Sequence, residues 1–125
     1  MNHPYHSPSA DSGAHAVIKQ ERTFALNVLG KGQGDVAYKF FKPATREGDK
    51  ISGEPVRKGA ATGQPILVNA PASIECKVAD IVERGDHHIV IGEVVEANVA
   101  KPPEGRADDA ILWMKDLGEK VFYGG

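Results

Sequence analysis

The residues of this chain whose types and spacing best suit chemistry lie in one short segment, Gly85-Asp86-His87 followed by Gly92. A histidine titrates near neutral pH, so its imidazole can donate or accept a proton or a hydrogen bond. The segment also has a purely structural interpretation, in which Gly85-Asp86 forms a hairpin turn, His87 is half exposed and Gly92 marks a bulge. A motif this short favours the structural interpretation when spacing is the only evidence.

Three other features carry weaker signals. Cys76 is the single cysteine, so an internal disulfide is excluded, and its inward-facing phase in a predicted strand indicates inert burial. His3 and His6 lack a third fixed ligand, and we predict no metal site there. Gly30-Lys31-Gly32 lacks the full spacing of a phosphate-binding loop, so we interpret it as a turn between a strand and a helix.

Size and composition predict a single globular domain. The chain has 125 residues, of which 41% are hydrophobic and 26% charged. With a formal net charge of -2 and no basic run, nothing indicates binding to nucleic acid or to an anionic membrane. No apolar run is long enough to span a bilayer, and residues 1–10 do not have the layout of a signal peptide, so we expect a cytoplasmic protein.

The first half of the chain predicts short elements. Residues 1–10 should be a flexible and dispensable tail, and a helix over residues 11–21, capped by Ser12, should pack through Val17 and Ile18. A strand over residues 23–29 precedes a second helix over 33–41, which Pro43 stops. Residues 44–63 are polar and rich in glycine, and we expect a long excursion with one short edge strand.

A long β-hairpin over residues 72–99 is the strongest structural signal. Its first strand alternates in period 2, which predicts one buried and one wet face: Ile74, Cys76 and Val78 against Ser73, Glu75 and Lys77. After the turn at 84–86, the second strand is apolar on both faces and should be central in its sheet. Residues 108–117 suit a short helix or a strand, and 120–123 a last strand, so we predict a mainly β barrel with two or three short helices.

Read in order, successive blocks of the sequence resemble the flavin reductase-like family, which adopts an FMN-binding split β-barrel. The resemblance runs from about residue 11 to the C-terminus. The blocks are Thr23-Phe24-Ala25-Leu26-Asn27-Val28-Leu29, Phe40-Phe41-Lys42-Pro43, Thr62-Gly63-Gln64-Pro65-Ile66-Leu67, Ala72-Ser73-Ile74-Glu75-Cys76, Gly85-Asp86-His87 and residues 12–18 and 116–123.

The resemblance also implies an arrangement of domains. Family members begin with strands that supply most contacts to the flavin phosphate and ring, and the sequence shows no such segment before residue 11. We therefore expect a tail over 1–10 and an N-terminally shortened split-barrel domain over 11–125. Unpaired edges and the likeness to a dimer-building family together predict a homodimer.

The activity implied by the resemblance is hydride transfer from NADH or NADPH to FMN or FAD, with reduced flavin kept or passed to a partner oxygenase. His87 matches the family's histidine beside nicotinamide and flavin and is the implied catalytic residue. Ser12 and Asn27 match blocks beside the flavin and are the implied cofactor-binding residues.

Two functions remain open at the level of sequence. The first is an NAD(P)H-dependent flavin reductase. The second is a non-catalytic, shortened barrel that binds flavin weakly or binds another small ligand, or that needs a partner chain to complete the barrel. A flavin phosphate needs several fixed amide or hydroxyl donors, and no obvious cluster of them stands in the sequence.

Overall fold

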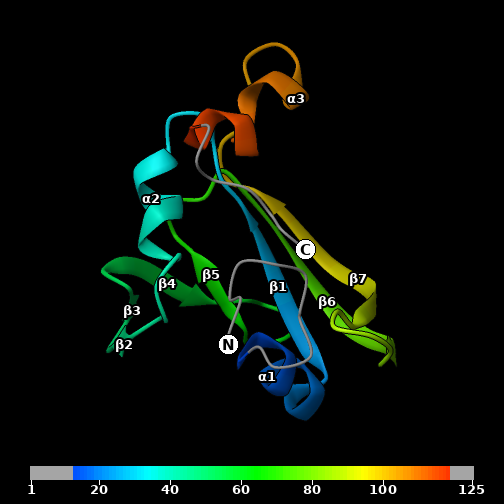
Figure 1. Cartoon of the computed structure of the whole chain (residues 1–125). Coiled ribbons are helices and arrows are strands. Elements are labelled where there is room, and N and C mark those ends of the chain that lie inside the picture. Colours follow the sequence, from blue (N-terminus) through cyan, green and yellow to red (C-terminus); the bar gives the residue numbers. More distant parts are fainter. Residues whose placement is uncertain (1–12, 119–125) are drawn as a thin grey trace.

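The computed structural model describes residues 13–118 and consists of two antiparallel sheets with short helices around them (Figure 1). The first sheet has the order β1-β6-β7 and the second the order β2-β3-β4-β5. The elements in chain order are α1 Gly13–Glu21, β1 Thr23–Val28, α2 Gly34–Lys39, β2 Arg46–Glu47, β3 Lys50–Ile51, β4 Glu54–Lys58, β5 Pro65–Leu67, β6 Ala72–Val82, β7 Ile89–Val99, α3 Ala107–Ala110 and the 3-10 turn η1 Met114–Leu117. The mainly β prediction with few short helices is confirmed.

The predicted hairpin forms as β6 and β7, but its second strand is not central. In the sheet described here β6 lies in the middle, paired with β1 on one side and β7 on the other. Apolar side chains of β7 are largely exposed, including Ile89, Ile91 and Val94. The prediction of a central second strand is therefore wrong. Apolar residues on both faces show that a strand is able to be buried on both faces, but they do not show which strands lie beside it. Within residues 13–118 no strand pairs with the outer edge of β7.

The polar excursion contains more structure than its composition predicts. Residues 44–63 hold β2, β3 and β4, which pair in succession, and β4 continues onto β5. One short edge strand was expected, and that expectation is wrong. Tight turns with positive φ at Gly48 and Gly53 permit the two reversals, a turn chemistry that a composition argument does not count.

The first helix packs through a residue that the apolar pattern did not select. α1 contacts β1, yet Val17 is 53% exposed and Ile18 is only half buried, so the predicted packing through Val17 is wrong. The buried residue of α1 is His15. Ser12, the tail over residues 1–10 and the predicted strand over 120–123 lie outside the described residues.

The second helix and the C-terminal segment agree better with the sequence. α2 lies within the predicted span and ends before Pro43. Instead of one element, residues 108–117 form α3, an isolated bridge from Ile111 to Gly30, and η1. The Tyr38 hydroxyl donates a hydrogen bond to the Leu117 carbonyl, which ties α2 to η1. Within residues 13–118 no helix has the length and apolar character needed to cross a membrane.

Burial along β6 includes polar side chains. Cys76 is buried as expected, and burial raises the pKa of its thiol, which fits an inert role. Ser73 and Glu75 are buried as well, so the predicted exposed face of this strand is wrong at these two residues and right only at Lys77. β1 and β7 pair with β6 along its two edges, and the buried carboxylate of Glu75 accepts hydrogen bonds from the protein.

Glu75 holds the turn between β4 and β5. Its carboxylate accepts hydrogen bonds from the Thr62 hydroxyl at 2.7 Å, the Thr62 amide at 2.9 Å and the Ala61 amide at 3.3 Å. Gly59 lies so close that a Cβ there would stand 2.0 Å from a Glu75 oxygen, so a larger residue would displace the carboxylate from these donors. This carboxylate therefore joins the two sheets of the molecule at a buried point.

We expect Glu75→Ala to lower the free energy of unfolding by about 2 kcal/mol or more, because buried donors would lose their acceptor. Glu75→Gln keeps one oxygen acceptor and should cost less. Urea unfolding of the two variants and the parent chain measures both values, and equal stability of all three would contradict the role given to Glu75.

The same carboxylate predicts a pH dependence of stability. Burial by itself raises the pKa of Glu75, but the hydrogen bonds from Thr62 and Ala61, with Arg57 nearby, outweigh it and hold the pKa below the usual value of a glutamate. A depressed pKa in the folded state gives stability that is present above the unfolded pKa and is lost as the pH falls through the folded pKa. The stability difference between the parent chain and Glu75→Gln should therefore shrink as the solution is acidified below about pH 4.

Candidate functional site

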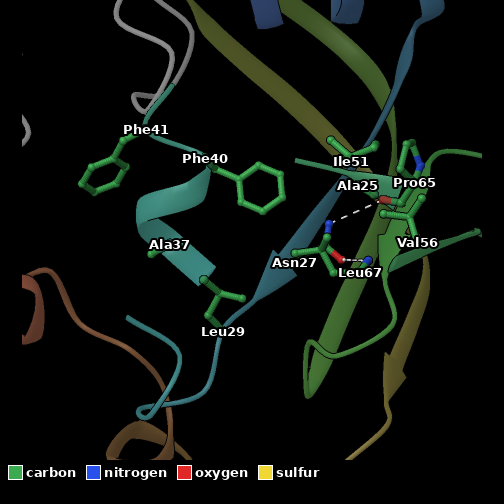
Figure 2. Close-up of a pocket in the computed structure, with 10 residues that line it drawn as sticks. All are labelled: Ala25, Asn27, Leu29, Ala37, Phe40, Phe41, Ile51, Val56, Pro65 and Leu67. Carbon is green, nitrogen blue, oxygen red and sulfur yellow. Dashed lines mark hydrogen bonds between the residues drawn. The ribbon is translucent and has the colours of Figure 1, made fainter. Parts of the chain in front are cut away.

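A cleft of about 460 Å³ opens between α2, β1 and β5. Its walls are mostly apolar, and Phe40 points into it from the end of α2, opposite Asn27 of β1 (Figure 2). The lining residues are Ala25, Asn27, Leu29, Ala37, Phe40, Phe41, Ile51, Val56, Pro65 and Leu67. The cleft therefore joins segments from three of the sequence blocks named above.

Asn27 is the polar side chain of this cleft, and its amide is held in place by β5. Its Oδ1 accepts a hydrogen bond from the Leu67 amide at 2.9 Å, and its Nδ2 lies 3.5 Å from the Pro65 carbonyl (Figure 2). These bonds connect β1 of the first sheet to β5 of the second. Asn27 thus fixes one wall of the cleft as well as facing into it.

We expect Asn27→Ala to lower the free energy of unfolding by about 1 to 2 kcal/mol, because the part-buried Leu67 amide would lose its acceptor. Asn27→Asp keeps that acceptor and serves as the matched control, with a smaller loss. Urea unfolding measures both, and a fully stable Asn27→Ala variant would show that β5 is held without this bond.

A second hollow of about 340 Å³ continues the cleft toward the C-terminal segment. It shares Asn27, Leu29, Ala37 and Phe41 with the first, and its far wall includes Trp113 and Leu117. Trp113 is held by its indole N–H, which donates to the Asp108 carbonyl at 2.8 Å. Together the two hollows make an elongated, open and largely apolar depression.

The chemistry of the lining suits a flat, apolar ring with a polar edge, such as the isoalloxazine of a flavin. Aromatic and aliphatic side chains offer contact area, and one oriented amide faces the space between them. None of the residues that line the two hollows is charged. The nearest cation of α2, Lys39, is paired with Glu54 at 2.6 Å. A phosphate group would therefore need donors other than these lining residues.

His87 lies away from this cleft. It follows the hairpin turn, its Nδ1 stands 3.2 Å from Asp86 Oδ1, and its side chain is partly exposed, as expected for a residue beside a turn. Asn27 pairs with Ser73 near the opposite end of β6. Eleven residues of strand separate these ends, a length on the order of 30 Å. In Figure 1 the hairpin turn and α2 accordingly lie on opposite sides of the molecule.

Of the three site residues predicted from the sequence, the structure places Asn27 in the cleft and His87 at the hairpin turn, outside the cleft. Ser12 lies outside the described residues. Sequence reasoning did not select Phe40, Phe41, Pro65 and Leu67 as site residues. A signal for them was present, because they stand in two of the blocks that carry the family resemblance, but their apolar types suggested core packing.

Known proteins are similar to this chain over most of its length. A sequence model described as the flavin reductase like domain matches residues 6–116. A flavin reductase of Pseudomonas putida is 36% identical over 108 residues, which is 86% of this chain and 58% of that protein. An NADH:riboflavin 5'-phosphate oxidoreductase of Streptomyces pristinaespiralis is 30% identical over 104 residues, covering 83% of this chain and 55% of its own length.

Solved structures give the same result. An NADH:FAD oxidoreductase of Streptomyces globisporus superposes with a TM-score of 0.63 at 31% identity, covering 73% of this chain and 54% of that one. The chain belongs to the flavin reductase-like family, and the predicted split-barrel fold class is confirmed. The chain spans about half the length of the curated relatives it matches.

Proposed function

We propose that this chain is part of an NAD(P)H-dependent flavin reductase, which transfers a hydride from NADH or NADPH to FMN or FAD. The observation that carries the proposal is the family match over residues 6–116, supported by relatives whose names specify NADH and a flavin. The structure contributes an apolar cleft with an oriented amide in the same region of the chain. We extend the functional domain over residues 11–125, with residues 1–10 as a tail.

In this proposal the cleft holds the flavin ring, and Asn27 orients it. Phe40 and Leu29 give apolar contact and exclude water from one face of the ring, while the amide of Asn27 meets its polar edge. The flavin, when bound, supplies the redox chemistry, and the protein supplies placement and electrostatics.

We further propose that the protein works as a homodimer and that His87 of one copy serves the cleft of the other. The distance along β6 separates His87 from Asn27 within one chain. The outer edge of β7 is long, unpaired within residues 13–118, and rich in exposed apolar side chains. A second copy at this edge would cover that surface and bring the hairpin turn to a second molecule.

The dimer predicts an effect of Ile91→Lys. Ile91 is 48% exposed on β7, and a lysine there should oppose association, shifting the protein toward monomer in sedimentation. Val68→Lys is the matched control, because Val68 is similarly exposed but lies outside β7. A parent chain that sediments as a monomer at micromolar concentration would contradict the dimer, and so would an Ile91→Lys variant that stays dimeric.

An oxygenase is the partner that we propose for the reduced flavin. A relative from Rhodococcus opacus, 35% identical over 85 residues, is named as the reductase component of a 4-nitrophenol monooxygenase. A structure neighbour at 26% identity is the reductase component of a two-component tryptophan halogenase. We propose the cytoplasm as the location, where NAD(P)H is available.

A second candidate function is a flavin- or ligand-binding barrel without reductase activity. Two observations favour it. The lining of the cleft is uncharged, and a structurally similar protein from Thermus thermophilus, 30% identical with a TM-score of 0.62, is an FMN-binding protein with bound p-hydroxybenzaldehyde. NADH oxidation in the presence of added FMN separates the two candidates. Turnover that depends on both compounds supports the reductase, while flavin binding without turnover supports the barrel.

A further inference from the structure

Three side chains with metal-ligating atoms converge where α1 meets the β6–β7 turn. His15 comes from α1, Glu83 follows β6, and His88 precedes β7. His15 and His88 are 73 positions apart in the sequence. In Figure 1 α1 accordingly lies beside the end of the first sheet where the hairpin turns.

The short helix α1 packs against the hairpin through a histidine and not through an apolar residue. His15 is 7% exposed and is the buried residue of α1, whereas Val17 on the same helix points to solvent. The His15 and His88 rings meet edge to face with centroids 4.2 Å apart. α1 is therefore fixed to the hairpin by a pair of imidazoles where an apolar contact would be the ordinary solution.

The ligand atoms stand at separations that suit one metal ion. His15 Nε2 lies 2.9 Å from His88 Nδ1 and 3.8 Å from Glu83 Oε2, and His88 Nδ1 lies 3.9 Å from the same oxygen. Tetrahedral zinc with ligand bonds of about 2.0 to 2.1 Å needs ligand atoms about 3.3 Å apart. The three observed separations bracket that value, so small side-chain movements complete the geometry.

We propose that His15, His88 and Glu83 bind a divalent transition metal of the zinc class, which clamps α1 to the hairpin turn. Two neutral imidazoles and a carboxylate are donors that zinc takes in proteins. The two histidine side chains are about one-tenth exposed and the carboxylate 40% exposed, so the site is enclosed by protein and open on one side. A water completes the coordination on that open side.

Lys19 opposes the metal. Its ammonium group lies 2.9 Å from Glu83 Oε1 and 3.0 Å from Oε2, the oxygen proposed as the ligand, and competes with a cation for the carboxylate. The hydrogen bond from Lys19 also lowers the pKa of Glu83. A variant that lacks the Lys19 ammonium group should therefore bind zinc more tightly than the parent chain.

The test measures zinc binding to the full chain by calorimetry, with His3 and His6 both replaced by alanine so that the N-terminal histidines do not contribute. We expect one equivalent of zinc, a higher melting temperature in its presence, and at least a tenfold loss of affinity in His88→Ala and in Glu83→Gln. Lys19→Met should bind more tightly. His87→Ala is the matched control and should keep full affinity, because His87 is adjacent in sequence but outside the cluster.

Cobalt absorption provides a second measurement that does not depend on how the variants fold. Tetrahedral Co²⁺ in the parent chain should give an intense visible band that zinc abolishes. Absence of saturable zinc binding would overturn the proposal and leave a hydrogen-bonded histidine pair. Undiminished affinity in folded His88→Ala and Glu83→Gln would overturn it as well. Neither measurement involves flavin, so the outcome is independent of the proposed reductase activity.

Discussion

Gly92→Val should destabilise the protein by roughly 3 kcal/mol or more, the upper range for forcing a branched side chain into occupied space. A Cβ at position 92 would stand 2.6 Å from the ring tip of Phe24 and 3.1 Å from Cys76 Cβ. Phe24 of β1 reaches across Cys76 of β6 and lies over Gly92 of β7, so the three strands touch at this point. The expected loss of stability thus comes from the close contact with the Phe24 ring and not from a central position of β7 in the sheet.

Two matched variants make the result interpretable. Gly92→Ala should be milder, because a single methyl mainly displaces the end of the Phe24 ring. Gly32→Val should have little effect on packing, since nothing lies within 4 Å of a Cβ there. Thermal and urea unfolding give the three values. Equal stability of Gly92→Val and Gly32→Val would show that Phe24 does not occupy the space above Gly92.

His87→Ala should lower the rate of flavin reduction strongly while leaving flavin affinity and folding nearly unchanged. A side chain that contacts the reacting rings only in the transition state affects turnover more than binding. His87 stands beside a turn and is partly exposed, so its truncation removes little packing. Steady-state NADH oxidation at varied FMN gives both parameters. A rate equal to that of the parent chain would remove His87 from the chemistry.

The proposal that His87 acts across a dimer has a direct complementation test. Ala37→Phe should block the cleft by filling it from α2, without touching the bonds of Asn27. His87→Ala and Ala37→Phe should each be inactive alone. Mixed dimers would then recover activity, because one of their sites combines an open cleft with an intact His87. Failure to recover activity in demonstrably mixed dimers would place His87 within its own chain's site or outside the reaction.

The sequence predicted elements whose signals are local. The period-2 pattern and the Gly-Asp turn identify the β6–β7 hairpin, and the break at Pro43 limits α2. The order of strands in a sheet and the contacts between distant segments could not be predicted from such local patterns. Whether β7 is central depends on which strand lies beside it, and the burial of Glu75 depends on donors from Thr62, which lies in the turn between two strands of the other sheet.

The residues of the candidate site were likewise only partly predictable from the sequence. Asn27 was selected through the family resemblance, and the structure places it in the cleft. The apolar walls were not selected, because Phe40 and Leu67 look like ordinary core residues until the cleft between them is known. The His15–His88 pair has no signal in the sequence, because the two residues are 73 positions apart and only the packing of α1 brings them together.

The most direct test of the proposed reductase is the oxidation of NADH by the purified chain, with and without added FMN. The proposal predicts turnover that requires both compounds and depends on free FMN in solution, because the cleft lining provides no charged group for the phosphate. Flavin that remains bound through purification would contradict the dependence on free FMN. No NADH oxidation by the folded protein at saturating FMN, or with NADPH in its place, would contradict the assignment as a flavin reductase.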